Sequence, residues 1–276
     1  MMNLPASTYY HDDKTTRAEK EEQDANIRGK IEQLRVEFPR AGYRPLLHLM
    51  RKNGVKIGER KLRRIIRKFD LQIRPRKRFV TTTDSKHNFK IYPNLIEEMT
   101  ITGVNQVWAS DITYIRIENG FVYLAVILDL FSRKAIGWAI SKSIDRHLTL
   151  SALKMAIKRR KPPKGVIHHS DRGAQYLCND YIKELKDNGF FISCSRKGNP
   201  YDNAWLESFM KTLKDNEVYM WEYKTILDVI ERIPHFIEEV YNKKRPHSSL
   251  GYFSPEEFEK QVKMEYSKED GPDLTL

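Results

Sequence analysis

Cysteine is scarce in this 276-residue chain, which contains only Cys178 and Cys194. The two match no metal-binding spacing, so we expect buried, reduced thiols in a cytoplasmic protein. Long apolar runs are also missing, because none approaches the roughly 18 residues of a membrane-spanning helix. The first residues lack the apolar core of a signal peptide as well. These absences argue against a cysteine metal site and predict a soluble protein with no membrane segment.

Acidic residues are scarce in one part of the chain. Residues 26–90 contain 20 Lys and Arg against 5 Asp and Glu, whereas residues 1–25 carry a net charge of −3 and residues 91–276 contain 26 of each sign. The formal excess of +12 therefore lies almost entirely in one segment. This distribution predicts a phosphate-binding domain followed by a nearly neutral catalytic domain.

The basic segment contains three apolar patterns at helical spacing, within 27–34, 46–50 and 62–69. A helix, a turn and a basic helix are typical of a helix-turn-helix module, whose last helix is available to the major groove of DNA. We assign 26–72 to this domain and 1–25 to a flexible or weakly helical lead-in. A solvated basic face on a helical bundle is the alternative. The candidate DNA-binding residues of the last helix are Arg60, Lys61, Arg63, Arg64 and Arg67.

Residues 73–100 are interpreted as a basic linker. The string RPRKRFVTTTDSKHNFK at 74–90 is interrupted by proline and rich in threonine, which favours an extended segment. Such a segment could follow DNA between two domains or simply be solvated.

Residues 101–220 combine three consecutive strand patterns with later strands that alternate with helices. An Asn-Gly pair between the first two patterns is a hairpin signal, so these three strands should be antiparallel. The order predicts an α/β domain with a mixed five-stranded sheet and helices on both faces. Residues 221–276 are expected to form a C-terminal helix near 225–241 and a tail that is disordered from Lys268. The expected core elements are strands at 105–118, 121–130, 133–141, 166–169 and 190–193, and helices at 143–158 and 174–188.

Two aspartates stand where strands can present them. Asp111 is in the middle of the first strand, where a carboxylate is costly to bury unless a cation lies against it. Asp171 follows the fourth strand in an Asp-Arg-Gly turn, from which its side chain can leave the sheet edge.

A third carboxylate is predicted on the helix that begins near Ala204, capped by Asp202 or Asn203. Its Glu207, Lys211 and Lys214 fall at i, i+4 and i+7, beside an apolar arc. Asp111, Asp171 and Glu207 together would form an oxygen-only site that suits Mg²⁺ or Mn²⁺. Such a site can hold two ions about 3.5–4 Å apart and serve phosphodiester chemistry.

Other polar residues near these positions have simpler interpretations. Asp129 is expected to be structural, Asp202 to cap a helix, and at least one of His168 and His169 to be packed, with a proton-shuttle role as the alternative. Three loop cations beside the site would suit clamping of DNA, with ordinary surface charge as the alternative. These cations are Arg172, Arg196 and Lys197.

Five motifs in order carry a family resemblance. The sequence contains WASDITY at 108–114, LDLFSR at 128–133, HHSDRGAQY at 168–176, SRKGNPYDNAWLESFMKTL at 195–213 and YNKKRPHSSLGYFSP at 241–255. In these motifs the chain resembles the DDE transposases of bacterial insertion sequences, specifically the downstream-frame product of two-frame elements. The 35 residues between Asp171 and Glu207 match the spacing of that family.

The resemblance implies a ribonuclease-H-like catalytic core similar to that of retroviral integrase. It implies metal-dependent cleavage and joining of DNA strands, with Asp111, Asp171 and Glu207 as catalytic and metal-binding residues. Because two element ends and a target must meet, it implies a homodimer or larger assembly on DNA, with a possible partner protein from the upstream frame. The protein would be bacterial, cytoplasmic and associated with the nucleoid when bound to DNA. A nuclease that never joins strands, or a non-catalytic DNA-binding protein, are the alternatives.

Overall fold

The computed structural model describes residues 16–73, 90–196 and 203–269. The chain divides into two compact units, Met1–Arg76 and Lys77–Leu276, which are considered separately. None of the helices in the described ranges is long and apolar enough to cross a membrane.

The N-terminal unit contains three helices: α2 (Arg17–Glu37), α3 (Tyr43–Lys52) and α4 (Glu59–Lys68). Ile31, Leu46 and Leu62, one from each helix, are fully buried, as their helical spacing predicts. Helix α2 begins inside the expected lead-in of 1–25, because Thr16 and Glu19 form a capping box that starts a helix there.

The second unit is built on a five-stranded sheet with the order β3-β2-β1-β4-β5. Strands β1 to β3 are antiparallel neighbours, whereas β4 and β5 run parallel to β1. The mixed sheet predicted from the order of the strand patterns is therefore confirmed. The strands are β1 (Val107–Ile117), β2 (Gly120–Asp129), β3 (Ala135–Ser141), β4 (Ile167–Ser170) and β5 (Phe191–Cys194).

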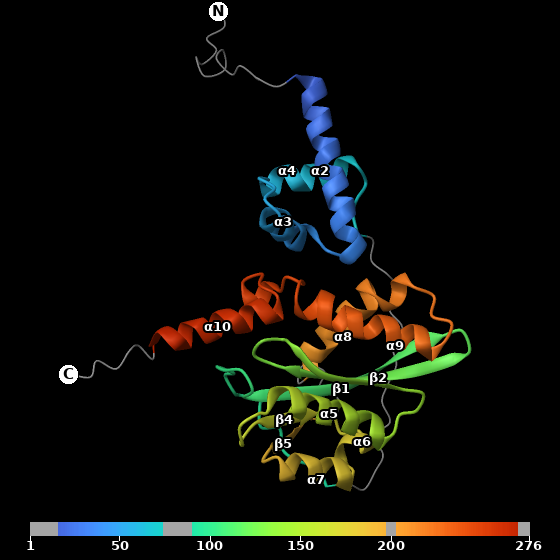
Figure 1. Cartoon of the computed structure of the whole chain (residues 1–276), viewed down its shortest axis with the longest axis vertical. Helices are drawn as coiled ribbons and strands as arrows, with labels where there is room; N and C mark the ends of the chain where they lie inside the picture. The colour runs from blue at the N-terminus through green and yellow to red at the C-terminus, as the bar shows by residue number, and fades with distance from the viewer. Residues whose placement is uncertain (1–15, 74–89, 197–202, 270–276) are drawn as a thin grey trace, which may run out of the picture. The chain divides into compact units, whose positions relative to one another are not determined.

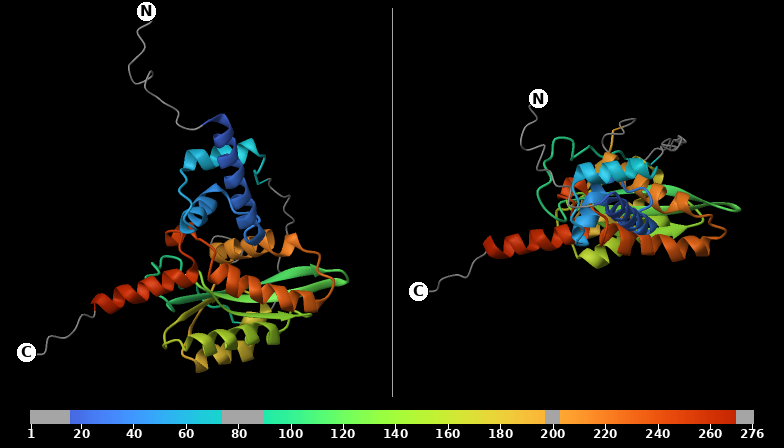
Figure 2. Two further views of the ribbon diagram at one scale, coloured as in Figure 1. Left: turned by 45° about the horizontal axis from the view of Figure 1, so that its top comes forward. Right: turned by 90° about the horizontal axis from the view of Figure 1, so that it is seen from above.

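Helices cover both faces of this sheet (Figures 1 and 2). Helices α5 (Arg146–Arg160), α6 (Ala174–Leu177) and α7 (Asn179–Asp187) lie on one face, and α8 (Ala204–Asn216) and α9 (Ile226–His235) lie on the other. The single helix expected at 174–188 is interrupted, because Cys178 has an extended backbone with ψ of 151°. Cys178 and Cys194 form no disulfide.

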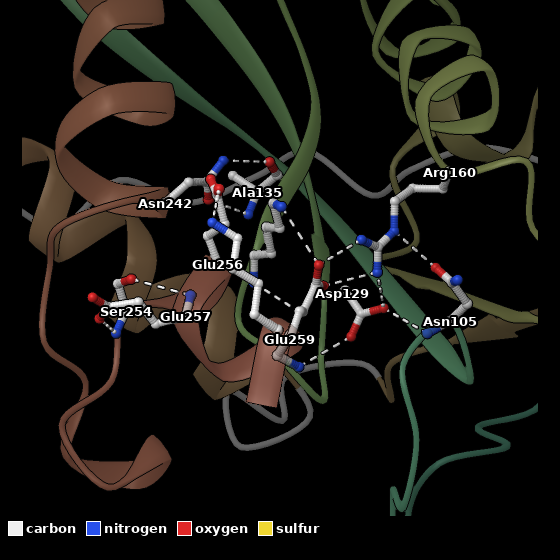
Figure 3. A network of polar contacts seen from close by, with 12 residues as sticks. Asn105, Asp129, Ala135, Arg160, Asn242, Ser254, Glu256, Glu257 and Glu259 are labelled. Carbon is white, nitrogen blue, oxygen red and sulfur yellow. Dashed lines mark hydrogen bonds and ion pairs between the residues drawn. The ribbon is translucent and has the colours of Figure 1, made fainter. Parts of the chain in front are cut away.

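The C-terminal segment continues α9 through a π-helix, η3 (Phe236–Asn242), which follows Pro234. Short 3₁₀ turns η2 (Val218–Met220) and η4 (Ser248–Leu250) flank this pair in sequence. The last helix is α10 (Pro255–Glu269). Its Glu259 accepts hydrogen bonds from Arg160 of α5 and from Ser132, which follows β2, and so attaches α10 to the sheet and its helices (Figure 3). Helix α10 extends past Lys268, where we expected disorder; residues 270–276 lie outside the described ranges.

Candidate active site

The register of the sheet brings two of the predicted aspartates together. Asp111 lies in the middle of β1, and its preceding residue, Ser110, pairs with Ser170 of the parallel strand β4. Asp171 follows Ser170 directly, so both aspartates occur at the same level of adjacent strands. Asp171 Oδ1 accepts the Gly173 amide at 2.8 Å, which fixes the turn after β4. The end of β4, which was predicted to present Asp171, is thus next to Asp111.

Asp111 is in an environment that disfavours its negative charge. Burial raises the pKa of Asp111 to about 7, and the charges of Asp171 and Glu207 act in the same direction. The contributions that lower the pKa of Asp111 are a 2.8 Å hydrogen bond from the Ile112 amide and the charge of Lys214. Burial and the two neighbouring carboxylates therefore keep part of the Asp111 population protonated near neutral pH, and a cation close to Asp111 would favour its ionised form.

Glu207 occupies the first turn of α8, where its side chain is solvent-exposed. Lys214, two turns along the same helix, places its Nζ 4.6 Å from the ring centroid of Tyr114 on β1. This cation–π contact orients α8 so that the predicted charged face meets the strand that carries Asp111. Across the described ranges, however, no three His, Cys, Asp or Glu side chains are arranged closely enough to hold a metal ion. Glu207 influences Asp111 electrostatically without closing a three-carboxylate site.

Two buried hydroxyl groups beside the aspartates were not anticipated. Tyr176 and Ser110 are each 2% exposed, and within the described structure neither hydroxyl forms a hydrogen bond of normal geometry. Burial and the charges of Asp111 and Asp171 raise the pKa of Tyr176, so its hydroxyl is close to both carboxylates. Unsatisfied hydroxyls next to carboxylates fit a hydrated cation, whose water molecules would supply the missing partners. The only sequence signal for Tyr176 is its position five residues after Asp171.

The two histidines before Asp171 are packed inside the fold. His168 Nε2 is 2.9 Å from the Tyr181 hydroxyl, and His169 Nδ1 is 2.8 Å from Ser193 Oγ. Burial and the neighbouring His169 lower the pKa of His168 to about 3, so it is neutral at physiological pH. This packing favours a structural role over a proton shuttle.

The basic helix α4 uses part of its charge inside the N-terminal unit. Arg64 and Lys68 contact Asp24 of α2 at 2.7 and 3.0 Å, and the Asp24 side chain is only 3% exposed. Arg64 was predicted to bind DNA, but Asp24, which belongs to the segment interpreted as a lead-in, holds both Arg64 and Lys68 against α2. Arg64 therefore stabilises helix packing as well as adding positive charge.

The other predicted cations of α4 differ in their contacts. Arg63 pairs with Glu59 at 3.4 Å and stacks over Tyr43, while Lys61 contacts a glutamine of α2. Arg60 and Arg67 are exposed and form no ion pair with any residue that the structure describes. These two are the most available for an external anion.

The loop cations near Asp171 are also partly engaged. Arg172 Nε donates to the Ser195 carbonyl at 2.9 Å, and Arg196 forms an ion pair with Glu97. Lys197 lies outside the described residues, as does Asp202. The residue at the N-cap of α8 is Asn203, whose side chain makes no capping hydrogen bond.

Comparison with known proteins gives consistent matches along the second unit. Two family models, each described as integrase core domain, match residues 102–200 and 188–255. The insertion element IS600 uncharacterized 31 kDa protein of Shigella sonnei is 38% identical over 218 residues, which cover 79% of this chain and 80% of that protein. Transposase InsF for insertion sequence IS3A of Escherichia coli is 37% identical over 211 residues, covering 76% and 73% of the two chains.

A solved structure is similar at lower identity. The HTLV-2 integrase catalytic core domain in complex with magnesium shares 16% identity and a TM-score of 0.44, covering 56% of this chain and 95% of that one. The sequence relatives, with the matching core models, show the family. The chain belongs to the IS3-type insertion-sequence transposases, DDE polynucleotidyl transferases with an integrase core domain.

Proposed function

We propose that the protein cleaves and joins DNA strands during transposition and DNA integration of its insertion sequence, in a metal-dependent reaction at Asp111, Asp171 and Glu207. The observation that carries this proposal is the pairing of Ser110 with Ser170, which puts Asp111 and Asp171 at the same level of adjacent strands, with Glu207 on the first turn of α8. Placing like charges next to one another inside a fold lowers its stability, which is expected where the charges serve a reaction.

The donor set favours Mg²⁺ or Mn²⁺, because carboxylate oxygens are hard ligands and no cysteine or available histidine takes part. We assign Asp111 and Asp171 as shared ligands and Glu207 as the ligand that completes the site when its exposed side chain turns toward them. Two ions bound there would activate the attacking oxygen and stabilise the leaving oxygen of a phosphodiester. The buried hydroxyls of Ser110 and Tyr176 would hold coordinated water.

The cations around the site have a binding role in this scheme. Lys211 is exposed and Lys214 is held over Tyr114, so the same face of α8 that carries Glu207 offers two positive charges to a DNA backbone. Arg172, Arg196 and Lys197 would contact the strands that enter the site. Each phosphate contact of this kind adds affinity without reading sequence.

The N-terminal unit is proposed to bind the element ends. Its exposed Arg60 and Arg67, with Lys61, Arg63 and Arg64, give α4 a cationic surface, as a recognition helix requires. Two ends must be processed together and joined to a target, so we infer a homodimer or larger assembly on DNA. A protein from the upstream reading frame is a further possible partner.

The decisive experiment incubates purified protein with a labelled duplex that carries the end of the source element, with Mg²⁺ or Mn²⁺. Glu207→Gln keeps the side-chain shape but removes its charge, and Glu231→Gln makes the same change at an exposed position of α9. We expect wild type and Glu231→Gln to nick and join strands, and Glu207→Gln to lose both activities, because the metal ions would lack one of their carboxylate ligands.

The alternatives give different products. Cleavage without joined strands would favour a nuclease. Binding without chemistry, even after addition of the upstream-frame product, would leave a DNA-binding protein only. Equal activity of Glu207→Gln and wild type would contradict the assigned site.

A further inference from the structure

The sequence motifs around Arg133 and Arg245 have no role in the proposed reaction, yet the fold brings them together. The Tyr241 hydroxyl of η3 donates to the Arg133 carbonyl at 3.0 Å. The ring of Tyr241 also packs edge-on against His247, with centroids 4.9 Å apart. Tyr241 thus connects the turn after β2 with the segment that follows η3.

The turn that carries Arg133 is held from several directions. Asp129 Oδ1 accepts the amides of Phe131 and Ser132 at 3.0 and 3.1 Å. The Asn242 side chain makes two 2.9 Å hydrogen bonds with the Ala135 backbone (Figure 3). Arg133 itself has a φ of 62°, in the left-handed region that non-glycine residues seldom occupy. A strained backbone that its surroundings enforce so strongly often belongs to a functional site.

The side chains presented there are cationic and incompletely satisfied. The Arg133 guanidinium stacks over Trp205 of α8 at 5.4 Å from the ring centroid, and its Nη1 is buried. Neither Arg133 Nη1 nor the buried His247 Nε2 has a hydrogen-bond partner in the described part of the chain. Arg245 is partly buried and likewise makes no ion pair with a described residue.

Electrostatics show that the three groups share one environment. Burial lowers the pKa of His247 to about 3, and the charges of Arg245 and Arg133 act in the same direction. Burial also lowers the pKa of both arginines. The charge of Asp129 raises the pKa of Arg133 and that of Asp215 raises the pKa of Arg245, but neither aspartate forms an ion pair with its arginine. Two partly buried guanidinium groups thus lack the close anion that would normally accompany them.

We propose that Arg133, Arg245 and His247 form a binding site for a phosphodiester of the DNA backbone, separate from the phosphodiester that reacts. The two guanidinium groups would bind the phosphate oxygens, and the neutral imidazole would donate from Nε2. Guanidinium forks match phosphate geometry, and burial strengthens each contact. The inference rests on the proposed function, because it supposes that DNA lies along α8.

The position of the site on α8 indicates that it would take a phosphate other than the reacting one. Trp205, under Arg133, and Glu207 are two positions apart, so their side chains leave the helix about 200° apart. The cluster and Glu207 therefore lie on different faces of α8.

The test is equilibrium binding of the full chain to the element-end duplex at several salt concentrations in the presence of a chelator. Loss of one phosphate contact should reduce the slope of log affinity against log salt by about 0.9 and weaken binding about eightfold at 0.1 M salt. We expect this for Arg245→Gln and for Arg133→Gln. Arg245→Lys should retain most of the slope. Lys183→Gln removes one exposed charge from α7 and should change neither quantity.

A melting curve by circular dichroism separates binding from folding. Removal of a guanidinium that has no close partner should leave the melting temperature of Arg245→Gln unchanged or higher. An unchanged slope with a lower melting temperature would overturn the proposal and make the cluster a structural support. If Arg133→Gln fails to fold, the difference in salt slope between Arg245→Gln and Arg245→Lys tests the phosphate site by itself.

The chelator makes failure of this inference distinguishable from failure of the proposed function. If wild type cleaves DNA with Mg²⁺ but Arg245→Gln keeps the full salt slope, the phosphate site is wrong and the reaction stands. If wild type never cleaves DNA but the slope falls as expected, the reaction is wrong and the phosphate site stands.

Discussion

Replacement of Arg160 by methionine should destabilise the catalytic unit strongly. Arg160 ends α5 and binds two carboxylates at once: Nη1 and Nη2 contact Glu259 at 2.8 Å each, and Nη2 contacts Asp129 at 3.3 Å (Figure 3). Its Nε also donates to the Asn105 side chain at 2.9 Å. The Asp129 side chain is fully buried, and those of Arg160 and Glu259 are 14% and 15% exposed.

The expected magnitude follows from this burial. Removing one partner of a buried ion pair leaves the other charge uncompensated and typically costs about 3–5 kcal/mol. Asp129 would keep hydrogen bonds from backbone amides, whereas Glu259 would keep Ser132 and a weak contact with Lys134. We therefore expect Arg160→Met to lower the free energy of unfolding by about 3 kcal/mol, the lower end of that range.

The same helix offers a matched control. Arg146 begins α5 and pairs with Asp180 at 2.9 Å, but both side chains are more than half exposed. Arg146→Met should cost less than about 0.5 kcal/mol, because exposed ion pairs contribute little.

Urea unfolding followed by tryptophan fluorescence isolates the relevant unit, since all four tryptophans lie after residue 100. Equal unfolding midpoints for Arg160→Met and Arg146→Met would refute the reasoning.

Three further predictions concern titration and ion pairing. Because the pKa of Asp111 is raised to about 7, its ionisation lowers the free energy of unfolding as pH rises from 3.8 through 7. Asp111→Asn should therefore raise the free energy of unfolding of the metal-free protein by up to about 4 kcal/mol at pH 8, with no gain near pH 4. The same variant should not be stabilised by Mg²⁺ in thermal unfolding. Because the pKa of His168 is lowered to about 3, the free energy of unfolding should fall by about 1.4 kcal/mol for each pH unit below 6.5. The urea midpoint of His168→Gln should depend less steeply on pH over that range, and equal pH dependence of the two proteins would contradict the buried neutral histidine. Asp24→Asn leaves Arg64 and Lys68 without their carboxylate and should destabilise the N-terminal unit by about 1–3 kcal/mol, measured as loss of helical circular dichroism on heating; an unchanged transition would show that Asp24 is not needed there.

The strands that carry the aspartates could be predicted because their signals are local. An Asn-Gly turn and β-branched runs mark the hairpin, and a short apolar run marks β4. Once β1 and β4 are parallel neighbours, the pairing of Ser110 with Ser170 puts Asp111 beside Asp171. The position of Glu207 on α8 followed from helical spacing.

Contacts between segments that are distant in the sequence could not be predicted from local patterns. The pairing of Asp24 with Arg64 joins residues 40 positions apart, and no pattern in 1–25 indicates a partner for either. The extended backbone at Cys178 lacks the proline or glycine that usually marks a helix break. Tyr176 likewise gave no sign that its hydroxyl would lie near the aspartates.

Asp111 and Asp129 show how the surroundings of a proposed metal ligand differ from those of a structural carboxylate. Both lie on strands of the same sheet within apolar runs. Asp129 accepts the amides of Asn105, Phe131 and Ser132 and contacts the Arg160 guanidinium. Asp111 accepts one amide and has two other carboxylates as neighbours. The fold thus gives Asp129 three amide donors and a close guanidinium, whereas Asp111 has one amide donor and two like charges nearby, an imbalance that a bound cation would relieve.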